Sequence, residues 1–241
     1  MIEVENLTKQ YNDFTAVKNV NFKVTKGEIF GYLGQNGAGK TTTINLLVTL
    51  LSPNEGKIFI QGLDVAVHAK KIRQLIGYLP DNLGLYPTLS VYQNLDFLAI
   101  LYHISKKERI NRIKELLKFF KLEEKQDVKF RDLSRGMKQK LGLAKALIHD
   151  PDILFLDEPT SNLDPIATKE VLELLLNLKS QGKTIFITTH LLHQAEKICD
   201  SIALLDKGEI IIAGPISTIK QQLNLESLED IYFKLMEGKY D

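Results

Sequence analysis

A glycine-rich segment near the N-terminus has the residue types and spacing that bind phosphate. The stretch Gly34 to Thr41 reads G-Q-N-G-A-G-K-T and fits the pattern G-x-x-x-x-G-K-[ST]. The glycines let the backbone curl so that several N–H groups point at one phosphate, and a helix starting there adds partial positive charge. We expect Lys40 to reach the β- and γ-phosphates and the Thr41 hydroxyl to bind Mg²⁺. The predicted nucleotide-binding residues here are Gly34, Gln35, Asn36, Gly37, Ala38, Gly39, Lys40, Thr41 and Thr42.

Two adjacent carboxylates follow the apolar segment 153–156. We expect Asp157 to hold Mg²⁺, directly or through water, and Glu158 to polarise an attacking water as a general base. An acidic turn that caps the next helix would have the same sequence, but the phosphate-binding loop upstream favours the metal site. These motifs indicate a nucleoside triphosphate, and further residues must choose among kinases, GTPases, motors and transporters.

The segment Leu133-Ser134-Arg135-Gly136-Met137 makes that choice. With it the chain resembles the ATP-binding cassette (ABC) family of transporter ATPases, whose signature L-S-G-G-Q stands ahead of a helix. Ser134 and Gly136 match, whereas Arg135 and Met137 depart from the pattern. A serine hydroxyl and glycine N–H groups at a helix start can form a second phosphate site. A simple serine cap is the alternative, but it does not explain the position before the 153–156 segment.

The resemblance implies roles for four further positions. Tyr11 corresponds to the aromatic residue that stacks on adenine, and His190 to the switch histidine that contacts the γ-phosphate. Asn162 stands for the usual glycine in the D-loop, which crosses to a partner subunit. Asp81 replaces the Q-loop glutamine, and its carboxylate can ligate Mg²⁺. The predicted catalytic residues are Lys40, Glu158 and His190; the predicted metal ligands are Thr41, Asp81 and Asp157.

The remaining titratable residues attract no catalytic prediction. His68, His103, His149 and His193 are interpreted as solvated loop residues, because no motif surrounds them. The single cysteine, Cys199, excludes an internal disulfide and fits a reducing compartment; we interpret it as structural.

Composition indicates an ordinary globular protein. The 241 residues are 44% hydrophobic and 25% charged, and the formal net charge is +1. That charge gives no support for bulk electrostatic binding to nucleic acid or anionic lipid. We expect no signal peptide, and no run approaches the 18 apolar residues of a membrane-spanning helix.

The elements that must position these residues are strands alternating with helices. Continuous apolar runs such as 153–156 and 184–188 are typical of strands buried on both faces of a parallel sheet. Segment 19–24 alternates and indicates an antiparallel piece, whereas 90–102, 106–120 and 134–149 have helical patterns. Ser105 is expected to cap the second helix with Glu108. Strands are expected at 2–7, 19–24, 28–33, 57–61, 75–79, 153–156, 184–188, 201–206 and 209–213.

The predicted fold is therefore α/β: a P-loop NTPase core with a mostly parallel sheet, an N-terminal antiparallel piece and an inserted helical subdomain. We expect one domain over 1–241, with a core of 1–81 and 151–241 and a helical subdomain at about 82–150.

The resemblance implies a function built on two chains. ATP and Mg²⁺ bound to one chain would be closed by the signature of a second copy or a paralogous ATPase. A separate integral membrane permease would dock at 81–93, where Tyr86 and Tyr92 lie. The chain would then be cytoplasmic, peripheral on the inner face of the cell membrane, and bind no nucleic acid.

The branch that the chain resembles is the daunorubicin-resistance type of exporter. Asp81, the segment Gly84-Leu85-Tyr86-Pro87 and the tail 227–233 carry this likeness. Two alternatives stay open: a soluble ABC ATPase that remodels a protein complex, such as the iron–sulfur assembly type, and, more weakly, a P-loop kinase or GTPase.

Overall fold

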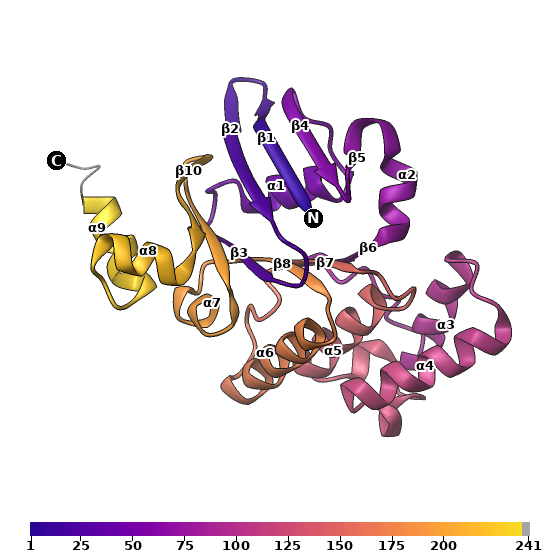
Figure 1. The fold of residues 1–241 in the computed structure, drawn as a ribbon. Coiled ribbons are helices and arrows are strands. Elements are labelled where there is room, and N and C mark those ends of the chain that lie inside the picture. Colours follow the sequence, from indigo (N-terminus) through magenta and orange to yellow (C-terminus); the bar gives the residue numbers. More distant parts are fainter. Residues whose placement is uncertain (238–241) are drawn as a thin grey trace.

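The computed structural model describes residues 1–237, which form two β-sheets flanked by helices. The N-terminal sheet is antiparallel, with strand order β2-β1-β4-β5. It lies above the larger sheet in Figure 1. Its strands are β1 (Ile2–Tyr11), β2 (Phe14–Val24), β4 (Glu55–Ile60) and β5 (Leu63–Asp64).

The larger sheet has six strands in the order β10-β9-β3-β8-β7-β6. All neighbouring pairs are parallel except β9 with β10. Every residue of β3, β7 and β8 is buried, which confirms the prediction from the continuous apolar runs. The strands are β3 (Ile29–Gly34), β6 (Ile76–Leu79), β7 (Ile153–Asp157), β8 (Thr184–Thr189), β9 (Ser201–Asp206) and β10 (Glu209–Pro215).

The two faces of this sheet pack into different cores because side chains alternate along each strand. Phe155 of β7 and Phe186 of β8 join the core beneath the antiparallel sheet, together with helix α1 (Lys40–Leu47). Leu154 and Ile185 join the core on the opposite face. Helix α6 (Pro165–Ser180) covers that opposite face. Helix α2 (Val65–Leu75) follows the antiparallel sheet along the chain. The C-terminal part consists of α7 (Leu192–Ile198), α8 (Ile216–Leu223) and α9 (Leu228–Glu237).

The chain between β6 and β7 is helical, as predicted. It holds α3 (Val91–Leu101), α4 (Lys106–Phe120) and α5 (Arg135–Ala146), with short 3₁₀ turns at Glu123–Lys125 and Phe130–Asp132. Ser105 caps α4 reciprocally with Glu108, which confirms the predicted capping box, and Ser90 caps α3 in the same way. Together with the two sheets, these helices confirm the predicted fold class.

Helix α5 lies unusually close to β6. A Cβ atom added to Gly77 would stand 2.2 Å from the carbonyl oxygen of Ala146. A Cβ atom on Gly142 would stand 2.7 Å from side-chain atoms of Leu79 and of Leu83. Only glycine leaves room for this approach, so the C-terminal half of α5 and strand β6 are packed as one unit.

The antiparallel piece differs in detail from the expectation. Strand β2 begins at Phe14 rather than at residue 19, and it pairs with β1 across the turn at residues 12–13. The turn at Lys26-Gly27 leads into β3, which belongs to the other sheet. The alternating pattern of 19–24 indicates a half-buried strand, but it does not show with which other strand this one pairs.

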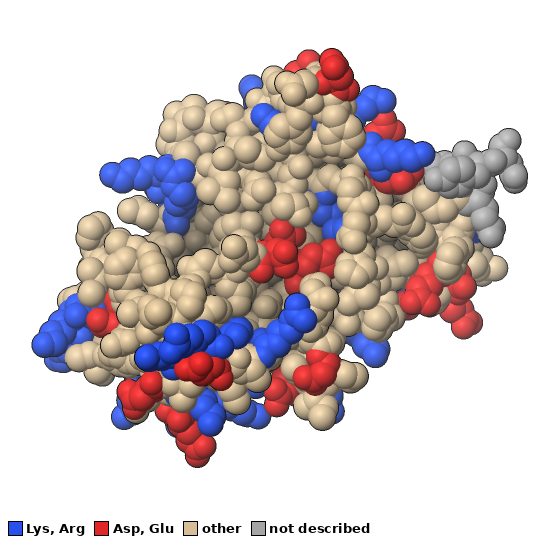
Figure 2. Space-filling model, turned by 180° about the vertical axis from the view of Figure 1, so that it is seen from behind, with Lys and Arg blue, Asp and Glu red and all other residues tan. Residues whose placement is uncertain are grey.

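Charges of both signs are interspersed over the face drawn in Figure 2, in keeping with 31 Lys and Arg against 30 Asp and Glu. None of the helices described within residues 1–237 combines the length and the apolar character needed to cross a bilayer.

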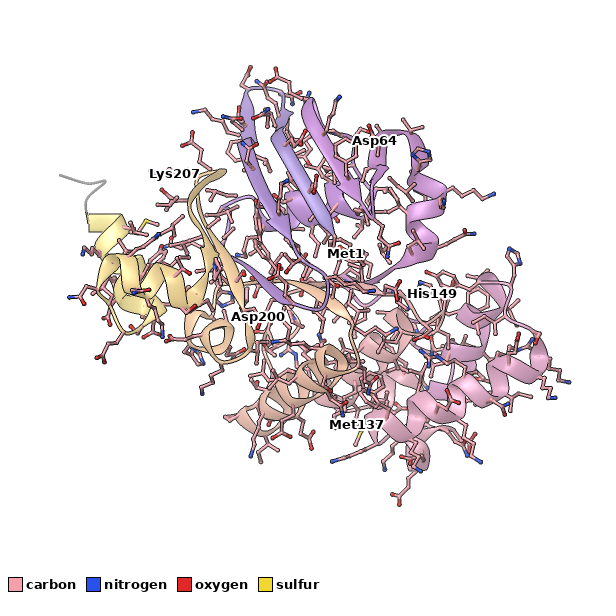
Figure 3. The ribbon with its side chains drawn as sticks, viewed as in Figure 1. Met1, Asp64, Met137, His149, Asp200 and Lys207 are labelled. Atoms are coloured by element: carbon pink, nitrogen blue, oxygen red, sulfur yellow. The ribbon has the colours of Figure 1, made fainter. Side chains whose placement is uncertain are left out.

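The interpretation of His149 as a solvated residue was wrong. It is half-buried where the helical segment meets the core (Figure 3), and its ring stacks on Tyr102 with centroids 3.9 Å apart. Its Nε2 lies 3.0 Å from the carbonyl oxygen of Ile76. Burial lowers the pKa of His149 to about 4, and the positive charge of Arg112 acts in the same direction. His68, His103 and His193 are exposed, as expected, but His68 lies in α2 and His193 in α7 rather than in loops.

This buried imidazole predicts a pH dependence of stability. The native state keeps His149 neutral down to about pH 4, whereas the unfolded chain takes up a proton near pH 6.5. Stability from this group is therefore complete above pH 6.5 and is lost as the pH falls, by up to about 1.4 kcal/mol per pH unit. His149→Gln should flatten this part of the profile in urea unfolding, whereas His68→Gln at an exposed site should leave it unchanged. Equal profiles for the parent and His149→Gln would contradict the assignment.

Candidate active site

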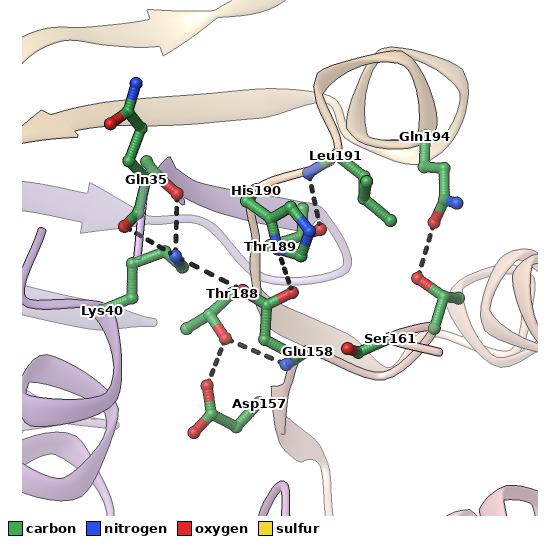
Figure 4. Close-up of polar contacts among 12 residues, drawn as sticks. Gln35, Lys40, Asp157, Glu158, Ser161, Thr188, Thr189, His190, Leu191 and Gln194 are labelled. Carbon is green, nitrogen blue, oxygen red and sulfur yellow. Dashed lines mark hydrogen bonds and ion pairs between the residues drawn. The ribbon is translucent and has the colours of Figure 1, made fainter. Parts of the chain in front are cut away.

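The candidate site lies where three parallel strands end at the same edge of the large sheet. Leu33 of β3 pairs with Thr189 of β8, and Asp157 of β7 pairs with Thr188. The segments that follow these strands therefore meet around one cavity of about 460 Å³ (Figure 4). Its lining is Phe14, Ala16, Asn36, Gly37, Gly39, Lys40, Thr41, Thr42, Asp81, Asp157, Glu158, Ser161, Asn162 and His190.

The glycine-rich loop joins β3 to α1 through left-handed backbone. Gly37 has φ +84° and Gly39 has φ +101°. A Cβ atom on Gly39 would stand 2.3 Å from the carbonyl oxygen of Ala16, so the loop is pressed against β2 at this point. No side chain caps α1, and its first N–H groups are left for a ligand in the cavity.

Glu158 links the loop to the end of β8. One carboxylate oxygen lies 3.3 Å from Lys40 Nζ, and the other lies 3.0 Å from His190 Nδ1 (Figure 4). Lys40 Nζ also donates to the carbonyl oxygens of Gly34 at 2.7 Å and Gln35 at 3.1 Å. The buried ammonium group is thus satisfied entirely by protein oxygens, which a phosphate would have to replace.

Backbone strain turns Glu158 into this position. Its φ of +49° is left-handed, which is uncommon for a residue with a side chain. Its N–H donates to both the carbonyl and the hydroxyl oxygen of Thr188, each at 3.1 Å. The neighbouring β8 strand therefore holds the turn that separates Glu158 from Asp157. Asn162 also has a left-handed backbone, at φ +59°, which asparagine tolerates in place of the expected glycine.

Asp157 is a buried carboxylate for which no cationic partner is found among the described residues. Burial raises its pKa, and the charges of Glu158 and Asp81 raise it further, against hydrogen bonds from the hydroxyls of Thr188 and Thr41. Burial of the Tyr78 hydroxyl raises its pKa to about 12, and the negative charges of Asp157 and Asp81 contribute in the same direction. The cavity is therefore strongly negative around Asp157.

The donor set fits a hard divalent cation. Carboxylate and hydroxyl oxygens are the ligands that Mg²⁺ takes, and it fills the rest of its shell with water and substrate phosphates. Asp157, Asp81 and the Thr41 hydroxyl supply such oxygens at one side of the cavity. Within residues 1–237, no cluster of three or more His, Cys, Asp or Glu side chains is arranged to hold a metal alone.

The structure places some predicted residues outside this cavity. Ala38 is buried beneath the loop, whereas Gly34 and Gln35 line a neighbouring groove. Tyr11 is 42% exposed, does not line the cavity and carries Lys9 Nζ at 5.4 Å from its ring centroid. Its cross-strand neighbour Phe14 lies at the cavity instead.

Three lining residues were not predicted: Phe14, Ala16 and Ser161. Ala16 enters through the close approach of β2 to Gly39, for which the sequence carries no signal. Phe14 could have been found from the short turn that pairs it with Tyr11.

The signature segment lies apart from the cavity of its own chain. Ser134 caps α5, and its hydroxyl accepts from the N–H of Met137 at 3.3 Å. Ser134 and Arg135 are exposed, while Gly136 and Met137 are partly exposed, and none of the four lines the cavity. The start of α5 is thus exposed and lies apart from this chain's phosphate-binding loop.

Comparison with known proteins gives consistent matches over nearly the whole chain. The profile described as "ABC transporter" matches residues 17–161. The Nod factor export ATP-binding protein I of Cupriavidus metallidurans is 38% identical over 230 residues, which are 95% of this chain and 76% of that protein. A solved ATP-binding subunit of an ABC transporter superposes with a TM-score of 0.88 at 34% identity, covering 98% of this chain and 99% of that one. A dimeric ATP-binding cassette in a post-hydrolysis state, bound to ADP and Pi, has a TM-score of 0.82 at 30% identity, covering 90% and 99%.

The two left-handed glycines of the loop give a matched pair of variants. Gly39→Ala places a methyl group 2.3 Å from a backbone oxygen, whereas Gly37→Ala meets nothing within 4 Å. Both variants bear the cost of a left-handed alanine, about 1 to 2 kcal/mol. In urea unfolding, Gly39→Ala should therefore lose clearly more stability than Gly37→Ala, and it should also bind ATP more weakly. Equal losses would show that the contact between Gly39 and β2 does not shape the loop.

Proposed function

The chain belongs to the ABC transporter family of ATP-binding proteins and is an ATPase, and from this premise we propose that it drives a separate membrane permease of an exporter. The observation that carries the proposal is the cavity at the ends of β3, β7 and β8, which combines a phosphate-binding loop with acidic residues and a histidine. The relative from Cupriavidus metallidurans is named as an export ATP-binding protein, and this supports the exporter class for the present chain.

We assign the hydrolytic roles from the geometry of three side chains. Lys40 neutralises charge on the β- and γ-phosphates, and its release from Glu158 frees that carboxylate. Glu158 then accepts the proton of the attacking water, a role that needs a carboxylate close to the γ-phosphate. His190, which contacts Glu158, orients this carboxylate and donates toward the γ-phosphate.

We propose that Asp157, Asp81 and Thr41 hold Mg²⁺ beside the phosphates. When bound, the ion neutralises the charge that develops on the phosphate oxygens. Asp81 supplies a charged oxygen where the family has an amide, so this site would carry one more negative charge than the usual one.

Adenine recognition is assigned to the turn between β1 and β2. Tyr11 and Phe14 are cross-strand neighbours, with 42% and 61% of their surfaces exposed. An exposed aromatic ring beside a phosphate-binding cavity can stack on a base without reading its hydrogen-bonding edge. We therefore assign adenine stacking to Tyr11, as the family resemblance implies, and Phe14 supplies a second aromatic ring at the same turn.

Two chains are proposed to complete each site. The signature residues Ser134–Met137 cannot close the cavity of their own chain in this structure, because none of them lines it. A second copy, or a paralogous ATPase, would bring its α5 start to the γ-phosphate. Ser161 and Asn162 line the cavity from the D-loop, where they would face that partner.

The permease is proposed to dock on the helical segment. Tyr86 is 49% exposed, and its ring meets Phe97 edge-on with centroids 5.2 Å apart. Buried Asn94 fixes the shape of the loop: its side chain bonds both the N–H and the carbonyl oxygen of Tyr86. Ile100 and Leu101 extend this apolar surface along α3. Tyr92, the other predicted contact, is only partly exposed.

These assignments place the protein at the inner face of the cell membrane, in the cytoplasm, without a role for nucleic acid. The helical subdomain, residues 82–150, would then be the part between the permease and the ATP-bearing core.

Substitution of Glu158 tests the proposed mechanism. Glu158→Gln keeps the size of the side chain but removes the base, so ATP hydrolysis should slow by about a hundredfold or more. The trapped ATP complex should elute at the mass of a dimer in size-exclusion chromatography. Ser134→Arg should stay monomeric with ATP and hydrolyse it slowly, whereas Glu173→Gln on the exposed face of α6 should behave as the parent. Parent-like hydrolysis by a monomeric Ser134→Arg would refute the two-chain site.

Loss of the exposed aromatic pair tests the permease surface. Tyr86→Ala with Phe97→Ala should abolish co-purification with a membrane permease from solubilised membranes and leave the hydrolysis rate of the isolated chain unchanged. Val67→Ala removes an apolar side chain that is 73% exposed on α2, and it should retain the complex. Capture of a soluble complex in place of a membrane protein would favour the remodelling alternative.

A further inference from the structure

The C-terminal helix α9 touches the phosphate-binding loop directly. Gln35 Nε2 donates a hydrogen bond to the Tyr232 hydroxyl at 2.7 Å, across 197 positions of sequence. Tyr232 does not line the cavity of the candidate active site. The contact therefore joins Gln35, a predicted nucleotide-binding residue, to a side chain that has no role in the assignments above.

Helix α9 is seated firmly enough to fix the position of Tyr232. Leu228 and Ile231 are buried in one cluster with Leu33, the residue that precedes the loop on β3. The N–H of Leu228 donates to Glu196 of α7 at 3.1 Å, and Lys220 of α8 forms an ion pair with the same carboxylate. The cluster with Leu33 and the bond to α7, which α8 braces through Lys220, thus hold the first turn of α9 against the end of β3.

Gln35 is held at two ends. Its side-chain amide bonds Tyr232, while its carbonyl oxygen accepts from Lys40 Nζ at 3.1 Å and from the N–H of Ala38 at 3.2 Å. When Lys40 turns to a phosphate, the carbonyl loses one of these partners. The bond to Tyr232 then remains as the side-chain anchor of the residue.

The outer side of the loop has little other support. A groove of about 710 Å³ separates Gln35 and Asn36 from the segment after β8 and from α9. Leu192 and Phe233 line its far walls. Residues 35–37 are exposed, and the hydrogen bond between Gln35 and Tyr232 is the side-chain contact by which α9 restrains the loop.

We propose that Tyr232 is a positioning residue for ATP binding, whose hydroxyl tethers Gln35 and keeps the phosphate-binding loop in the shape that receives the triphosphate. The proposal rests on the nucleotide site at Gly34–Thr42 but on neither the dimer nor the permease. A loop already held in its binding shape loses less conformational freedom on binding, so the tether strengthens affinity rather than chemistry. By linkage, ATP binding and the seating of α9 favour one another equally.

A double-mutant cycle on the isolated chain tests the tether, with ATP as the probe in calorimetry. Tyr232→Phe should raise the Kd and KM of ATP about two- to tenfold, the range for one lost hydrogen bond, with kcat within about twofold. Gln35→Ala should raise the Kd at least as much, because Gln35 is itself a predicted nucleotide-binding residue. The double variant should bind ATP no more weakly than Gln35→Ala alone, because both changes remove the same contact. The melting temperature without nucleotide should stay unchanged. Lys234→Gln, on the same helix but bonded to Leu223, should match the parent.

An unchanged Kd for Tyr232→Phe, or effects that multiply in the double variant, would overturn the tether. A fall in kcat together with the melting temperature would show a merely structural role and would also overturn it. Lys40→Ala separates this outcome from failure of the site itself: if that variant binds ATP like the parent, the nucleotide site is misplaced whatever Tyr232 does.

Discussion

The parallel register of β3, β8 and β7 is the constraint on which the site depends. Parallel neighbours end at the same edge of a sheet, so the pairings of Leu33 with Thr189 and of Asp157 with Thr188 bring three distant segments together. The burial of both sheet faces fixes this register, because a slip by one residue would exchange the side chains of the two cores. Loop, carboxylates and histidine thus owe their meeting to hydrophobic packing beneath them, which reaches the loop through Ala38.

The electrostatics of the cavity follow from what this packing leaves unpaired. Lys40 faces three carboxylates, those of Asp81, Asp157 and Glu158, and forms its ion pair with only one of them. Glu158 shares its two oxygens between Lys40 and His190, whereas Asp157 keeps hydroxyl partners only. This imbalance leaves negative charge on the Asp157 side of the cavity, and it underlies the proposed roles of Asp157 in holding Mg²⁺ and of Glu158 as a base once Lys40 turns to a phosphate.

Much of this could be predicted from the sequence because the strongest signals are local. The loop pattern, the apolar runs of β7 and β8 and the Ser105 cap each depend on a few adjacent residues, and the fold they imply is confirmed. The pairing of β2 with β1, the entry of Ala16 and Phe14 into the cavity and the burial of His149 depend on contacts between distant segments. The bond between Gln35 and Tyr232 is of the same kind. The roles assigned to Tyr11, Asp81 and the signature remain predictions, because they concern bound molecules.

The close packing of α5 on β6 has a mechanical consequence. Twelve residues of helix span about 18 Å from the signature at one end to Ala146 at the other. Since Gly77 admits no gap at Ala146 and Gly142 admits little at Leu79, the helix and the strand can pivot only together. Strand β6 runs antiparallel to α5, from Gly77 at Ala146 to Leu79 at Gly142, so Asp81, which follows the strand and lines the cavity, lies on the side of this contact toward Ser134. A tilt of a few degrees at the pivot would be enlarged into a shift of ångströms at Ser134.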